Sequence, residues 1–111
     1  MTQAEYTVEE LMACAVSREL RDGELGFIGL GTGGRAFVMA VGIPTVAIRL
    51  AQHRGVDFIA QYGVKLEPVI EEAPECFTDA NLLAWRCRAM IPVEDALDMF
   101  RRGMMDWGFV S

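Results

Sequence analysis

The sequence contains few of the residues from which metal sites and disulfide frameworks are built. It has three cysteines, Cys14, Cys76 and Cys87, and one histidine, His53. The cysteines are odd in number and far apart, and no Cys-x-x-Cys pair occurs, which argues against a structural zinc site. Unpaired thiols are typical of a reducing compartment. We therefore expect a cytoplasmic protein with no bound metal.

The sequence also lacks an excess of positive charge and a long apolar run. Its net charge is −6 at pH 7, and no basic stripe is present that would neutralise the phosphates of a nucleic acid. The longest apolar run, Phe37–Ile48, contains Gly42 and Pro44 and is too short to span a membrane. The first residues, MTQAEYT, carry no basic segment of the kind that begins a signal peptide. We expect neither a nucleic acid nor a membrane as a partner.

The hydrophobic pattern alternates between strands and helices within one small domain, residues 1–111. A capping box at Thr7 and Glu10 begins a first helix, which ends at Asp22-Gly23 and is expected to bury Cys14. The other helices are expected to begin at Pro44 and to span Pro92–Arg102, and the strands are expected at Leu25–Leu30, Phe37–Val41, Asp57–Ala60, Leu66–Ile70, Ala89–Ile91 and Met105–Val110.

This alternation predicts an α/β fold with a mostly parallel open sheet flanked by helices. Hydrophobic residues make up 52% of the chain, which is enough for a packed core. The pattern stops on an apolar strand. We therefore expect either that another chain completes the sheet or that the domain is truncated.

The segment Gly29–Gly34 matches the G-x-G-x-x-G pattern, in which backbone N–H groups approach a diphosphate. However, no long helix is expected directly after it, and Asp57 precedes its strand instead of following one, where it could hold a ribose. Two interpretations stay open. Either the loop contacts a ligand or it is a tight connection between two strands. The glycines concerned are Gly31, Gly33 and Gly34, and Arg35 directly after them is the best-placed cation for an anionic ligand.

A polar tip, Gln61-Tyr62-Gly63, follows the strand expected at Asp57–Ala60. Ligands in open α/β sheets bind where strands end. The neutral amide of Gln61 can bind a carbonyl or carboxylate group but cannot act as a nucleophile. The alternative is a turn with Gly63 at positive φ. Glu67 begins a run of acids that supplies a carboxylate near the tip or, alternatively, forms a solvated face.

Three blocks of the sequence resemble the small, β-type subunit of class I coenzyme A-transferases, of the glutaconate CoA-transferase kind. They are YTVEELMACAVSRELRDGE, VGIPTVAIRLAQHRGVDFIAQYG and IPVEDALDMFRRGMMDWGFVS, and they cover nearly the whole chain. The resemblance implies an α/β fold, a hetero-oligomer with an α-type subunit, and movement of CoA between carboxylic acids through a glutamyl-CoA thioester. It also implies acyl-CoA as the substrate, bound along Phe37–Gly63 with Gly42, Tyr62 and Gly63 among the binding residues.

The sequence departs from the family's pattern at three places. Gln61 matches the family's catalytic glutamate, with Glu67 as a displaced alternative. Leu25–Arg35 has the position of an insertion, because family members pass from the Asp-Gly turn directly into the strand that matches Phe37–Val41. The chain ends at Ser111, where the family's subunits continue, so we expect the N-terminal part of such a subunit.

Three functions stay open on this basis. The first is a subunit of a CoA-transferase-like enzyme that acts on the acyl-CoA thioester of a carboxylic acid and is inactive without its α-type partner. The second keeps the fold and replaces transfer by hydrolysis or ring cleavage of a CoA thioester, because Gln61 is not a nucleophile. The third is a non-catalytic assembly module.

Overall fold

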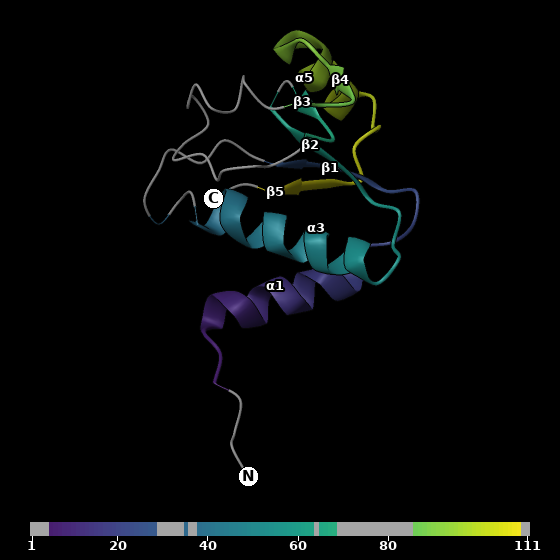
Figure 1. The fold of residues 1–111 in the computed structure, drawn as a ribbon. Helices are drawn as coiled ribbons and strands as arrows, with labels where there is room; N and C mark the ends of the chain where they lie inside the picture. The colour runs from purple at the N-terminus through teal and green to yellow at the C-terminus, as the bar shows by residue number, and fades with distance from the viewer. Residues whose placement is uncertain (1–4, 29–34, 36–37, 64, 69–85, 110–111) are drawn as a thin grey trace.

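The computed structural model of the chain describes residues 5–28, 35, 38–63, 65–68 and 86–109. In chain order its elements are α1 (Val8–Glu19), β1 (Leu25–Ile28), the π-helix η1 (Val38–Gly42), α3 (Ile43–His53), β2 (Ile59–Tyr62), β3 (Lys65–Leu66), β4 (Ala89–Met90), α5 (Val93–Arg101) and β5 (Trp107–Phe109). Helices α1 and α3 lie side by side on one side of the strands, and α5 lies apart from them near β3 and β4 (Figure 1). The described residues form a small α/β domain.

The strands form one five-stranded sheet in the order β4-β3-β2-β1-β5. Strand β1 pairs in parallel with β2 and β5, whereas β2–β3 and β3–β4 are antiparallel pairs. The sheet is therefore mixed, and the expectation of a mostly parallel sheet is wrong. The reason is the tight turn after Tyr62, where Gly63 adopts a φ of 57° and Tyr62 pairs with Lys65. A parallel pair would instead need a long crossover connection.

Helix α1 begins where the sequence predicts and ends at Glu19, shortly before the expected Asp22-Gly23. The Thr7 Oγ1 accepts a hydrogen bond from the Glu10 backbone N–H at 3.1 Å, and Gly23 leaves the turn after the helix with a φ of 81°. The helix buries Ala13 and Ser17, which are one turn apart. Cys14, next to Ala13, is exposed, so the expectation that it belongs to the core is wrong.

The strand expected at Phe37–Val41 is also wrong for the residues that the structure describes. Val38–Gly42 is a π-helix that continues directly into α3. Buried Ala40 and Val41 lie about two helical turns before buried Ala47 and Ile48, so this apolar run follows the period of a helix. The strand after the Asp22-Gly23 turn is β1, as the sequence predicts.

The other expected elements are found with shifted ends. Strand β2 begins at Ile59 and runs through Tyr62, so the expected polar tip belongs partly to the strand. Of the strand expected at Leu66–Ile70, the structure shows β3, and residues 69–70 lie outside the described residues. Helix α5 confirms the amphipathic helix after Pro92. The apolar segment at the end of the chain forms β5 and pairs with β1 inside the same sheet.

The core lies between the sheet and helices α1 and α3, and it leaves no room for a side chain at Gly26 of β1. A Cβ atom built on Gly26 would lie 2.6 Å from Cζ of Phe58, whose ring is itself buried. We expect Gly26→Ala to lower the free energy of unfolding by about 2 kcal/mol, because overpacking forces buried groups to shift. Urea denaturation measures this loss.

Gly42→Ala is the matched control. A Cβ atom there would meet nothing within 4 Å, and Gly42 has helical φ and ψ angles. Alanine should leave the stability unchanged or raise it by up to about 1 kcal/mol. Equal stability of the Gly26→Ala variant and the unmodified protein would contradict the packing that the structure shows around Phe58.

Candidate functional site

The side chains of β2 alternate between the two faces of the sheet. Ala60 and Tyr62 belong to the core cluster on the α3 side. Gln61 lies between them and points to the opposite face, because successive residues of a strand alternate. Its register partner in β1, Phe27, is on this second face and packs edge-to-face against Phe100 of α5 at 5.1 Å between ring centroids. Gln61 therefore lies on the α5 side of the sheet.

Gln61 is completely buried, with an exposed fraction of 0%. Its Nε2 donates a hydrogen bond to the backbone oxygen of Gly63 at 3.0 Å, which ties the side chain to the turn that follows the strand. Its Oε1 is buried without a hydrogen-bond donor among the described residues. A buried acceptor without a partner costs about 1–3 kcal/mol. The positive φ of Gly63 confirms the turn interpretation of this segment.

Glu67, the alternative carboxylate, lies just beyond β3 and closes the end of the β2–β3 pair. Its backbone N–H donates to the oxygen of Ala60 at 2.8 Å, and its Oε1 accepts from the N–H of Ala60 at 2.7 Å. Its φ of 51° lies in the left-handed region, which is uncommon for a residue with a side chain. Glu67 shares a cavity with Tyr62, on the face opposite Gln61. The structure therefore does not bring the two candidate catalytic residues together.

The cavity under α3 is small, about 40 Å³, and its walls are Ile48, Arg49, Gln52, Ala60, Tyr62, Glu67 and Pro68. The Tyr62 hydroxyl lies 2.7 Å from Oγ1 of Thr45 on α3. Burial raises the pKa of Tyr62 to about 12, and the hydrogen bond with Thr45 opposes the rise only in part. At neutral pH Tyr62 is therefore an uncharged phenol, which can donate a hydrogen bond but cannot act as a base.

The sequence analysis did not single out the α3 residues beside Tyr62. Thr45, Arg49 and Gln52 follow the spacing i, i+4, i+7, which places them on one stripe of a helix. That spacing is the signal that could have identified them. Lys65 was also missed. It is buried and in register with Tyr62, so it lies on the same face of the sheet.

A second hollow, of about 220 Å³, lies between the first turns of α1 and the passage from η1 into α3. Its walls are Glu9, Glu10, Ala13, Val38, Gly42, Ile43 and Val46. Gly42 therefore borders a cavity, as a ligand-binding residue would. Residues Gly31, Gly33 and Gly34 of the glycine-rich segment lie outside the described residues.

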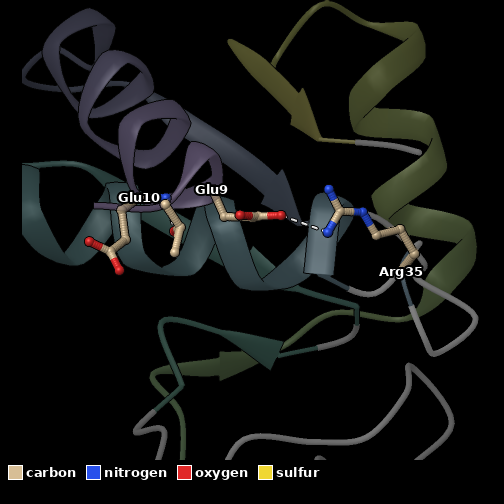
Figure 2. Close-up of polar contacts among 4 residues, drawn as sticks. Glu9, Glu10 and Arg35 are labelled. Carbon is tan, nitrogen blue, oxygen red and sulfur yellow. Dashed lines mark hydrogen bonds and ion pairs between the residues drawn. The ribbon is translucent and has the colours of Figure 1, made fainter. Parts of the chain in front are cut away.

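Arg35, the expected ligand cation, forms an ion pair with Glu9 at the border of this hollow. Its Nη1 lies 2.6 Å from Oε1 of Glu9, and the Glu10 side chain points away from the pair (Figure 2). A backbone hydrogen bond at the start of α1 and then the bond from Arg35 lower the pKa of the Glu9 carboxyl. Glu9 is therefore ionised at neutral pH, and it holds the guanidinium group of Arg35.

The remaining candidates are not grouped into a site. His53 is exposed at the last turn of α3. Within the described ranges, no group of three or more His, Cys, Asp and Glu side chains is arranged to hold a metal ion. No helix in that part of the chain has both the length and the apolar character needed to cross a membrane.

Comparison of the chain with protein-family models, with curated proteins and with solved structures gives no match. The structure by itself defines the class of the protein as a small α/β domain with a mixed sheet. The resemblance to CoA-transferase subunits stays a prediction from the sequence.

Proposed function

We propose that this chain is one subunit of a CoA-transferase-like enzyme that binds the acyl-CoA thioester of a carboxylic acid together with an α-type partner. We further propose that its chemistry directs water to the substrate and forms no glutamyl-CoA thioester. This choice depends on the amide at Gln61, which is fully buried and bonded to Gly63 where the resemblance expects a nucleophilic glutamate.

Two features of the fold support a ligand at the carboxyl ends of the parallel strands. The unit β1–α3–β2 is a pair of parallel strands joined through a helix. Ligands of such units bind beyond the carboxyl ends of the strands. The small cavity lined by Arg49, Tyr62 and Glu67 lies at such an end, because Tyr62 is the last residue of β2.

Glu67, the alternative to Gln61 as the nucleophile for covalent transfer, is bonded to the backbone of β2. One oxygen of the Glu67 carboxylate accepts a hydrogen bond from the backbone N–H of Ala60, near the end of β2. A carboxylate that accepts a hydrogen bond is a weaker nucleophile, because the bond stabilises its charged form. In hydrolysis, water adds to the acyl carbon and the thiol of CoA leaves with a proton, so no carboxylate of this chain needs to bond to the substrate.

The general base for that step is expected from the partner subunit. Tyr62 keeps its proton at neutral pH, because its pKa is raised to about 12. Gln61 is not basic. A base from the partner explains why the chain is expected to be inactive alone.

The test uses the full natural complex, purified with the subunit that accompanies this chain. It is incubated in ¹⁸O-labelled water with a panel of acyl-CoA thioesters of dicarboxylic, aromatic and alicyclic acids, with and without an acceptor acid. We expect release of CoA thiol without the acceptor and one ¹⁸O atom in the product, measured by a thiol assay and by mass spectrometry. Borohydride should trap no adduct on this chain.

Other results would support the other functions. A borohydride-sensitive CoA adduct on Glu67, together with acceptor-dependent exchange, would support transfer and contradict hydrolysis. If the complex neither binds acyl-CoA in calorimetry nor turns over any thioester of the panel, the enzyme proposal fails and the non-catalytic assembly module is favoured.

A further inference from the structure

We propose that the hollow between α1 and η1–α3 is a binding site for a small apolar group that carries an ammonium ion. This site is distinct from the cavity beside Tyr62 and does not depend on the proposed acyl-CoA chemistry. Its residues come from two segments that lie side by side, the first turns of α1 and the passage from η1 into α3.

The walls of the hollow are apolar and accessible. Val38 is 37% exposed and Val46 is 50% exposed, while Ala13 and Ile43 are buried and close its floor. The volume of about 220 Å³ exceeds the roughly 150 Å³ that holds a benzene ring in an engineered apolar cavity. An apolar ligand with about six carbons therefore fits, and it gains free energy by covering these side chains.

The backbone at the wall has an unusual form, and its last residue has no side chain. Val38–Gly42 is a π-helix, a form that is rare and often occurs at functional sites. Gly42 ends it, and a Cβ atom at Gly42 would meet nothing within 4 Å. The helical φ and ψ angles of Gly42 would allow any side chain at this position. The absence of a side chain therefore leaves open space in the wall.

The charges at the border of the hollow favour a cationic head group. Two carboxylates, Glu9 and Glu10, lie there. Glu9 is neutralised by Arg35 at 2.6 Å, whereas Glu10 forms no ion pair with any residue that the structure describes (Figure 2). The local sum is one negative charge, with the Glu10 carboxylate available to an ammonium ion. A ligand carboxylate would meet an Arg35 side chain already paired with Glu9 and would lie beside the Glu10 carboxylate.

The experiment compares three probes with the same apolar ring and different heads: cyclohexylmethylammonium, cyclohexanecarboxamide and cyclohexanecarboxylate. Binding to the full chain is measured by NMR titration, with shifts followed at Ala13, Gly42 and Val46. We expect millimolar dissociation constants for ligands of this size. The ammonium probe should bind about tenfold more tightly than the carboxylate, with the amide between them.

Two variants identify the site. Gly42→Leu should fill the hollow and weaken all three probes at least tenfold without lowering Tm, while Gly42→Ala should keep the binding. Glu10→Gln should remove the advantage of the ammonium probe and leave the amide unchanged. Glu19→Gln, at the far end of the same helix, is the control for a change of overall charge.

Three results would overturn the proposal. They are the absence of binding of every probe at millimolar concentration, unchanged binding to the folded Gly42→Leu variant, and tightest binding of the carboxylate. The last result would make Arg35 the recognition group in place of Glu10. None of these results bears on acyl-CoA turnover by the complex, so the two proposals fail separately.

Discussion

The substitution Gln61→Glu is expected to lower the free energy of unfolding by several kcal/mol at neutral pH. The side chain is 0% exposed, and its register partners Phe27 and Leu66 are apolar. A carboxylate there would lose the bond that Nε2 donates to Gly63 and would place an oxygen against that carbonyl. Burial of an unpaired charge costs several kcal/mol, or else the group takes up a proton.

The loss from Gln61→Glu should depend on pH in one direction. Burial would raise the pKa of the new carboxyl in the folded state above its unfolded value of about 4.3. The penalty is then small below about pH 4 and grows as the pH rises toward the folded-state pKa. Urea denaturation of the variant and the unmodified protein between about pH 4 and 8 measures this difference.

Gln61→Met is the matched control for burial without charge. It removes the unsatisfied Oε1 together with the Nε2 bond and should change the stability by less than about 1.5 kcal/mol. If the glutamate variant is as stable as the unmodified protein at every pH, the carboxylate reaches solvent and the strand end is open. That result would favour transfer chemistry over the hydrolysis proposed above.

The second large effect is expected in alkaline solution and depends on Tyr62. Its pKa is raised from 10.0 to about 12 in the folded protein, chiefly because the phenol is buried. The buried, protonated phenol contributes fully to the free energy of unfolding below pH 10. This contribution is lost as the pH rises from 10 toward 12, because the unfolded chain loses the proton first. A difference of two pKa units corresponds to about 3 kcal/mol.

Tyr62→Phe should therefore flatten the decline of stability above pH 10. At pH 7 the same variant should lose about 1 kcal/mol, because Thr45 loses its hydrogen-bond partner. Urea denaturation in steps from about pH 7 to 11.5 measures both effects. The chain has one other tyrosine, Tyr6, which is exposed, and Tyr6→Phe should keep the alkaline decline of the unmodified protein. An identical decline in the Tyr62→Phe variant would contradict a buried phenol at this position.

The hollow at η1 shows why part of the candidate site could not be predicted. Gly42 was selected from the sequence as a residue of a turn that contacts a ligand, and it does line a cavity. The sequence pattern, however, indicated a strand at Phe37–Val41, because a short apolar run fits a buried strand and a buried helix equally well. Packing of this segment against α1 favours the helix. The contact joins residues about thirty positions apart in the sequence, such as Met12 and Met39.

The features that could be predicted from the sequence are those that depend on neighbouring residues. The Thr7 cap, the helix starts at Pro44 and Pro92, and the glycine-dependent turns at Gly23 and Gly63 follow from local hydrogen bonds and allowed φ angles.

The direction of the strands, and the faces on which their side chains lie, depend on contacts between distant parts of the chain. If the register of β2 shifted by one residue, each of its side chains would lie on the other face of the sheet, because the period of a strand is two residues. Gln61 and Glu67 were predicted near one another and lie on opposite faces of the sheet. Pairing such as that of Gly26 with Trp107 sets this register, and its energy comes from contacts between residues far apart in the sequence.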